Sequence, residues 1–216
     1  MSSNLGELWS AGDLLIAIDG HHLWAIDFKK KEVAWRREFT EGLWGFVFAP
    51  NQSLVYIGDQ VGLIHELRCR DGSTSRILKG PVSPVNKLAL SPDGRLLLSA
   101  SSNREITLWD LERGTMLRSL ASTEDVLGTS QFSPDGKTVL AQHDVFYLGF
   151  WHVATGQRLL SSGAWGTRAL LWQPTPDGRA VYLGVCDEGR ISVRKLVLDG
   201  RQGPPTAAQT APAHPD

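Results

Sequence analysis

Histidine, aspartate and cysteine side chains stand next to one another at three places in the sequence, and their types could support metal-binding, acid–base or nucleophilic chemistry. The three places are His21-His22, His143-Asp144 and Cys186-Asp187. Adjacent residues of a strand point to opposite faces, so the two histidines could not share one metal ion. His143 and Asp144 lack the third group and the cleft that acid–base catalysis needs. No histidine near Cys186 could activate its thiol. We therefore expect two solvated hairpin tips and an inert thiol.

Longer catalytic patterns are also missing from the sequence. It contains no glycine-rich phosphate loop, no G-x-S-x-G elbow and no His-Glu-x-x-His pair. A glycosidase would need paired carboxylates along the inner strands. The segments expected to form those strands, LWGFVF, VNKLALS, VLGTSQFS and TRALLWQ, carry none. The sequence thus predicts a protein that is not an enzyme, with no catalytic, cofactor or metal site. An enzyme on the same frame is the less favoured alternative.

Size and charge narrow the possible partners. The 216 residues carry a net charge of -1, and 21% of them are charged, which gives no reason to expect nucleic acid as a partner. No apolar run reaches the length of about 18 residues that a membrane span needs. The first residues lack the basic start and apolar stretch of a secretion signal. Cys69 and Cys186 lie far apart and are expected to be reduced. These features predict a cytoplasmic protein without membrane or nucleic-acid partners.

A repeat of 42 residues organises the chain. Prolines recur at that spacing, namely Pro50, Pro92, Pro134 and Pro176, and Asp-Gly follows the last three. Turn glycines keep the same interval at Gly72, Gly114 and Gly156, as do Trp109 and Trp151. A period of about 40–45 residues is typical of β-propeller blades. Within each repeat, short apolar segments bounded by turn residues predict four antiparallel strands, which one sheet alone could not shield from water.

The repeat predicts an all-β fold, a propeller of about five four-stranded blades over residues 1–200. The blades are expected near residues 3–40, 41–80, 81–121, 122–163 and 164–200. Residues 5–9 are the segment left for the inner strand of the first blade. Residues 200–205 are a poor outer strand for the fifth, because glycine and proline weaken strands. Residues 201–216, rich in proline and alanine, are expected to form a disordered tail.

On these residues the sequence resembles the WD-repeat β-propeller family. Residues 78–120 match its pattern well, with Trp109-Asp110 at the place of the eponymous dipeptide, whereas LWAID and AWRRE in the first repeat resemble quinoprotein-like propeller repeats. In the WD family a histidine, an aspartate and a serine often link to the third-strand tryptophan. Here Pro81 and Thr123 stand at histidine positions, and Ala141 stands at a position equivalent to Ser99. We therefore expect apolar packing in place of that polar relay.

Five repeats are few for a family that the resemblance associates with about seven blades. Either five blades close into a tight ring, or an open arc is completed by another chain. An open edge of apolar strands favours pairing, so a homodimer or a complex with another protein through the blade edges is a possible outcome.

Loops entering the inner strands line one rim of a propeller and offer the best binding candidates. The predicted partner-binding residues are Trp44, Asn86, Asp125, Trp165 and Arg168. Tryptophan and arginine dominate protein contact sites, although packing between blades could instead use both tryptophans. Lys29, Lys30, Lys31, Arg36 and Arg37 are expected to form a solvated basic edge. We predict a non-catalytic scaffold that presents this rim to a partner peptide or domain. The alternative is a structural subunit whose incomplete propeller is completed by another chain.

Overall fold

The computed structural model describes residues 8–80, 83–103, 105–121, 126–143, 147–162, 168–175, 180–187 and 190–197. Within these ranges the secondary structure consists of strands β1 to β19, arranged in five sheets. The all-β prediction is therefore confirmed, together with the four-stranded blade pattern in four of the sheets. The chain divides into two compact units, residues 1–126 and residues 127–216.

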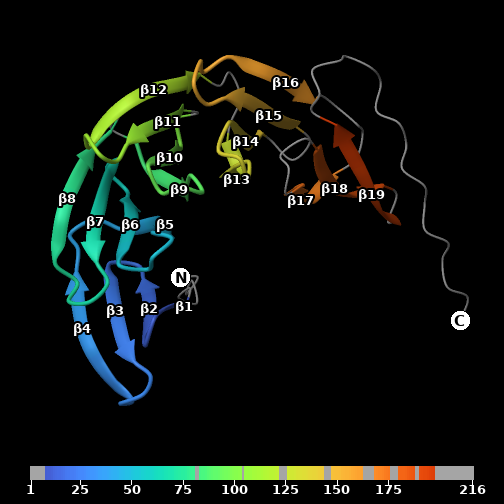
Figure 1. The fold of residues 1–216 in the computed structure, drawn as a ribbon. Helices are drawn as coiled ribbons and strands as arrows, with labels where there is room; N and C mark the ends of the chain where they lie inside the picture. The colour runs from blue at the N-terminus through green and yellow to red at the C-terminus, as the bar shows by residue number, and fades with distance from the viewer. Residues whose placement is uncertain are drawn as a thin grey trace, which may run out of the picture. The chain divides into compact units, whose positions relative to one another are not determined.

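The first unit contains three four-stranded sheets, in each of which consecutive strands pair (Figure 1). The first sheet has β1 (Leu8–Ala11), β2 (Leu14–Asp19), β3 (His22–Asp27) and β4 (Glu32–Glu38). The second has β5 (Leu43–Phe48), β6 (Leu54–Asp59), β7 (Leu63–Arg68) and β8 (Thr74–Lys79). The third has β9 (Val85–Leu90), β10 (Leu96–Ser101), β11 (Glu105–Asp110) and β12 (Thr115–Ala121). Inner strands β1, β5 and β9 lie on one side, and outer strands β4, β8 and β12 lie on the other.

The second unit contains the other two sheets. The fourth sheet is made of β13 (Val126–Phe132), β14 (Thr138–His143), β15 (Tyr147–His152) and β16 (Arg158–Ser162). The last sheet is made of β17 (Arg168–Pro174), β18 (Ala180–Asp187) and β19 (Arg190–Val197), so its described part has three strands. Residues 200–205, weighed as an outer strand, and the predicted tail at 201–216 lie outside the described residues.

The repeated Ser-Pro-Asp-Gly sequence forms the same turn twice. The Ser91 hydroxyl donates to Asp93 at 2.6 Å, and the amide of Arg95 donates to that carboxylate at 3.1 Å. Gly94, with φ of 69°, supplies the left-handed conformation. These hydrogen bonds, above all the one from Ser91, hold the pKa of Asp93 below its usual value of 3.8. The turn at Ser133 to Gly136 repeats the arrangement, with 2.6 Å between the serine hydroxyl and the aspartate.

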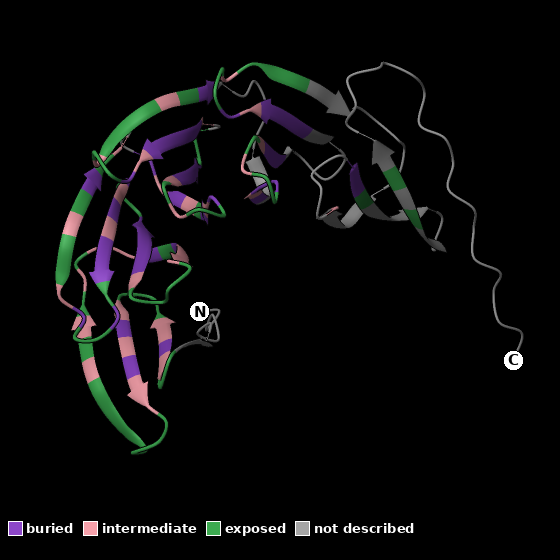
Figure 2. Cartoon of the chain, viewed as in Figure 1, coloured by how far each residue is buried: buried purple, intermediate pink, exposed green. Residues whose placement is uncertain are grey.

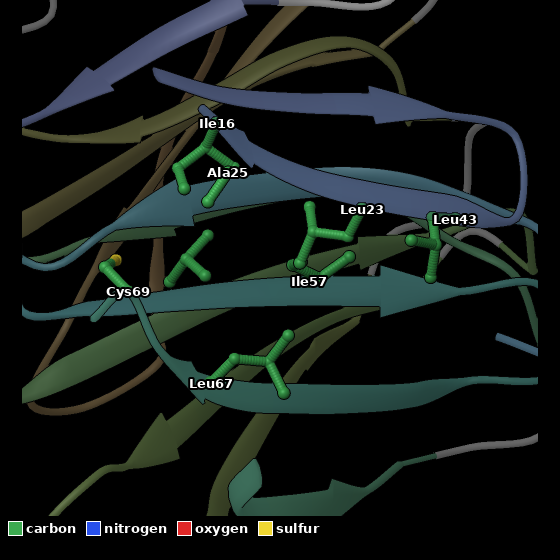
Figure 3. Close-up of a cluster of buried hydrophobic side chains, with 8 residues drawn as sticks. Ile16, Leu23, Ala25, Leu43, Ile57, Leu67 and Cys69 are labelled. Atoms are coloured by element: carbon green, nitrogen blue, oxygen red, sulfur yellow. The ribbon is translucent and has the colours of Figure 1, made fainter. Parts of the chain in front are cut away.

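Apolar side chains fill the spaces between successive sheets of the first unit. One cluster joins the first two sheets through Ile16, Leu23, Ala25, Leu43, Val55, Ile57, Leu67 and Cys69 (Figure 3). A second cluster joins the second and third sheets through Tyr56, Ile64, Leu78, Val85, Leu88, Leu97, Trp109 and Leu111. Burial is concentrated in the middle strands, whereas much of the outer strands is exposed (Figure 2). The middle strands of the second sheet therefore pack toward both neighbouring sheets, as their alternating side chains allow.

One tier of the second sheet carries polar groups where the first sheet has Ile16, Ala25 and Trp35. Tyr56 on β6 pairs with Glu66 on β7, which pairs with Arg76 on β8. The guanidinium of Arg76 lies 2.5 Å from the carboxylate of Glu66, which is 5% exposed. Burial, together with the charge of Glu66, raises the pKa of Tyr56 to about 12. The buried carboxylate is thus compensated by a cation from the outer strand, as a buried charge requires.

The first inner strand is described at Leu8–Ala11, and residues 5–7 of the segment expected to form it lie outside the described residues. One expectation about local detail needs correction. The polar relay expected to be absent is present in part, because Trp109 Nε1 donates to Ser99 Oγ at 2.9 Å between two buried side chains. The serine is enough to satisfy the indole N–H, whatever stands at the histidine position. Apolar packing therefore does not act alone in the third sheet.

Candidate functional site

One rim of the first unit is built from the β2–β3, β6–β7 and β10–β11 turns and from the segments that lead into β5 and β9. Backbone hydrogen bonds tie these segments together. The amide of Leu43 donates to Gly20 O at 2.8 Å, and the amide of Gln60 donates to Gly42 O at 2.9 Å. At the next sheet the amide of Ser102 donates to Pro84 O at 3.0 Å. The rim is therefore fixed by its own backbone.

Trp44 is a large apolar side chain that this rim exposes, as is Val61 in the β6–β7 turn, which is 40% exposed. Trp44 lies on β5, where the register with β6 shifts between Leu43 and Phe46, and its side chain is 57% exposed. A Cβ placed on Gly42 would lie 3.6 Å from Trp44 Nε1 and 3.2 Å from Gln60 Oε1, with the His21 ring 4.0 Å away. Packing between sheets therefore does not use most of this indole. The sequence alone left open whether packing between blades would bury Trp44.

Asn86 lies on β9, the inner strand next to β5 on the same rim. Its amide exchanges hydrogen bonds with the hydroxyl of Ser102, at 2.9 and 3.2 Å. A Cβ on Gly45 would lie 2.7 Å from Asn86 O, so β5 and β9 approach each other closely at this point. Two of the predicted binding residues, Trp44 and Asn86, therefore lie on adjacent inner strands of the rim. We call Trp44 and its polar neighbours the rim cluster, which comprises His21, Trp44, Gln60, Asn86 and Ser102.

A buried aspartate holds the β6–β7 turn of the rim in place, and sequence reasoning missed it. Asp59 is 2% exposed and accepts hydrogen bonds from the amides of Val61 at 3.0 Å and Leu63 at 2.8 Å. Its second oxygen lies 2.9 Å from His65 Nε2. The Phe39 ring covers that histidine edge-on, with 5.1 Å between centroids. The only available signal was Asp59 itself, at the start of the hairpin Asp-Gln-Val-Gly.

The remaining predicted site residues fall in less well described parts of the chain. Asp125 and Trp165 lie outside the described residues. Arg168 begins β17, for which the backbone is described. The same holds for His143, at the end of β14, and for Cys186, on β18. Their roles stay predictions. Cys69 is buried without a disulfide, and burial raises the pKa of its thiol to about 11, which disfavours the reactive thiolate.

The basic edge of the first sheet behaves as expected at its lysines but not at Arg37. Lys29 Nζ lies 2.9 Å from a carboxylate oxygen of Asp13, and the hydrogen bond between them is the main cause that raises the pKa of Lys29. Lys30 lies 3.5 Å from Asp27. Arg37 instead reaches the second sheet, where its Nη1 donates to Gly72 O at 2.7 Å and to Thr74 at 2.8 Å. The expectation of a solvated edge is therefore wrong for Arg37, which joins two sheets.

Metal-binding clusters and membrane-spanning helices are two features that would mark other classes of protein. No group of three or more His, Cys, Asp and Glu side chains there could hold a metal ion. None of the described segments forms a helix long and apolar enough to cross a membrane. The chemistry that the rim cluster offers is an exposed indole among hydrogen-bonding imidazole, amide and hydroxyl groups, which suits recognition of another polypeptide.

Comparison with known proteins gives a match to a family model and matches to several relatives. The model of the WD domain, G-beta repeat, matches residues 72–110. Periodic tryptophan protein 2 homolog of Schizosaccharomyces pombe is 31% identical over 111 residues, which cover 50% of this chain and 13% of that protein. Meiotic recombination protein rec14 of the same organism is 31% identical over 77 residues, which cover 35% of this chain and 26% of that protein. Apoptotic protease-activating factor 1 of Rattus norvegicus is 32% identical over 129 residues, which cover 56% of this chain and 10% of that protein. The matches span a minor part of each relative.

Proposed function

This chain belongs to the WD-repeat family, and from that membership and the geometry of its rim we propose that it is a non-catalytic scaffold that binds a partner peptide or domain through the rim cluster. Members of this family typically bind protein partners and are generally not enzymes. The observation that carries the proposal is Trp44, which is 57% exposed at the centre of a rim held by backbone hydrogen bonds. Tryptophan is among the residue types that dominate protein contacts.

The mechanism is geometric. Asp59 fixes the β6–β7 turn through two backbone amides, and the Asn86–Ser102 hydrogen bonds join the start of β9 to the β10–β11 turn. Because these segments are already ordered, binding of a partner costs the rim little conformational entropy. The indole supplies the apolar anchor, and the amide and hydroxyl groups around it supply orientation. Binding through Asp125, Trp165 and Arg168, and a cytoplasmic location, remain part of the proposal.

Quantitative affinity capture from cells that express the full chain tests this function. We expect partners recovered with the unmodified protein to be depleted at least about tenfold with Trp44→Ala, since loss of a central aromatic anchor costs about 2 kcal/mol or more. Met116→Ala is the matched control, because Met116 on β12 is 53% exposed and lies outside the rim cluster. Recovery should be unchanged by that substitution.

Two results would count against the rim. Equal recovery with Trp44→Ala and with the unmodified protein would show that the indole is not an anchor. Equal depletion by Trp44→Ala and Met116→Ala would show that the loss does not come from the rim cluster. Circular dichroism of both variants establishes that each retains its β structure.

A further inference from the structure

The first sheet carries an apolar face that points away from the second sheet. Ile16, Leu23 and Ala25 belong to the cluster shared with the second sheet. Side chains alternate along a strand, so the residues between them point the other way. These are Leu15, Ala17, Trp24 and Ile26, all half-buried, and Phe28 follows β3 with 44% of its side chain exposed. We call these five residues the backward face of the first sheet.

Strand register identifies the equivalent positions in the next two sheets. Leu15 pairs with Ile26 across β2 and β3. The equivalent pairs are Val55 with Leu67 and Leu97 with Trp109. Those four side chains are at most 2% exposed because they pack against the preceding sheet. Cys69 and Leu111, at the position of Phe28, are 3% and 8% exposed. The first sheet therefore has the apolar side chains of such an interface while leaving them partly open to water.

The last sheet shows the complementary pattern on its forward face, the face that in the first and second sheets packs toward the following one. Tyr182 pairs with Lys195 across β18 and β19, at the positions of Leu140 and Phe150 in the fourth sheet. Leu140 and Phe150 are completely buried, whereas Tyr182 is 44% exposed. Val193 is 58% exposed on the same face. Val181, which points the other way, is completely buried.

We propose that the backward face of the first sheet binds the forward face of the last sheet of a second copy of this chain. The two faces are the two sides of the interface that already joins the first sheet to the second and the second to the third. One polypeptide therefore carries both halves of a head-to-tail contact, so a second copy can supply the complement of either face. Exposed contiguous apolar surface of this kind marks an interaction site.

The turn after β3 fits this occupant. In the second and third sheets the equivalent turns hold Gly72 and Gly114, on which a Cβ would lie 2.6 Å from Trp35 and Arg76 of the preceding outer strand. The first sheet has Lys31 at that position, with φ of 57°. The Lys31 side chain would occupy the space that Trp35 and Arg76 occupy in the other two contacts. A sheet that packs against the first sheet can therefore place no outer strand against this turn. The described part of the last sheet consists of β17, β18 and β19 and presents no fourth strand to this turn.

Light scattering after size-exclusion chromatography tests the contact on the full chain. The unmodified protein is expected to show a mass of at least two chains, each of 23.7 kDa. Phe28→Glu alters the backward face and Val193→Glu alters the forward face, and each should give single chains, with a dissociation constant at least about tenfold larger. Ile77→Glu is the matched control, since Ile77 on β8 is 43% exposed and lies on neither face. It should associate like the unmodified protein.

Mixing the two variants distinguishes a head-to-tail contact from any symmetric one. Phe28→Glu retains an intact forward face and Val193→Glu an intact backward face, so an equimolar mixture should give a particle of two chains. Failure of the mixture to associate would overturn the head-to-tail assignment. A single-chain mass for the unmodified protein across the micromolar range would overturn the second copy as occupant, whatever then covers either face. Trp44→Ala should leave the mass unchanged, so this result is independent of the rim proposal.

Discussion

Gly72 lies beneath the ring of Trp35 where the first and second sheets meet, and Gly72→Ala should destabilise the fold through that contact. The added Cβ would lie 2.6 Å from Cε3 of the ring. Trp35 cannot easily withdraw, because its Nε1 donates to Cys69 O at 2.9 Å. Gly20 provides a control in the same unit, since it also has a positive φ, of 56°, but nothing lies within 4 Å of its Cβ position. The two substitutions share the backbone cost and differ in the steric one.

The magnitudes follow from these two costs. A left-handed backbone costs a non-glycine residue about 1–2 kcal/mol, and reduced freedom of the unfolded chain returns about 0.4–1 kcal/mol. Gly20→Ala should therefore lower the free energy of unfolding by about 1 kcal/mol. Overpacking adds about 1–3 kcal/mol, so Gly72→Ala should lower it by about 2–4 kcal/mol. Lys31, with φ of 57° at the equivalent uncovered turn, indicates that the backbone term alone is tolerable.

Urea unfolding followed by tryptophan fluorescence and by far-ultraviolet circular dichroism measures both variants. Coincident transitions from the two signals are needed before the free energies are compared. Combining Gly72→Ala with Trp35→Leu should recover part of the steric cost, because the smaller side chain makes room for the methyl group. Equal destabilisation by Gly72→Ala and Gly20→Ala would refute the close approach of the two sheets at this turn.

Two further predictions concern hydrogen bonds within the repeats. Ser99→Ala should lower the free energy of unfolding in urea by about 1–3 kcal/mol, since it leaves the buried indole N–H of Trp109 without its acceptor. In a Trp109→Phe background the same substitution should have almost no effect, and an unchanged loss of stability there would contradict this account. The pKa of Asp93 is lowered by folding, mainly through the Ser91 hydroxyl, so the carboxylate stabilises the fold above its unfolded pKa and this stabilisation is lost as the pH falls through the lower, folded value. Asp93→Asn should flatten the decline in unfolding free energy between about pH 4 and pH 2, and an unchanged slope would show that the carboxylate does not contribute.

The fold was largely predictable because its signals are periodic. The prolines at intervals of 42 residues, with Asp-Gly after three of them, mark turns whose chemistry requires those residue types, and the structure has such turns at Ser91 and Ser133. Short apolar segments between the turns form the strands. Strand bounds were less predictable, because a short apolar segment such as the first inner strand, described at Leu8–Ala11, has little turn chemistry to fix its ends.

The rim was predictable in part. Trp44 was chosen by residue type and position, but its exposure depends on how β5 and β9 pack, which a single sequence does not reveal. Asp59 and His65 were missed because their pairing joins a turn to a strand across the β6–β7 hairpin. Arg37 was assigned to a solvated edge by its neighbours in the sequence, whereas its contacts lie about 35 positions along the chain, at Gly72.

All strand pairs described join segments that are neighbours in the sequence, and this locality bears on how the chain folds. Short hairpin loops cost little entropy to close, so each sheet can form before distant parts of the chain are in place. Stability then accumulates from one repeat to the next through their shared apolar layers, much as in a linear array. Folding that starts in any one repeat could therefore spread to its neighbours through those layers.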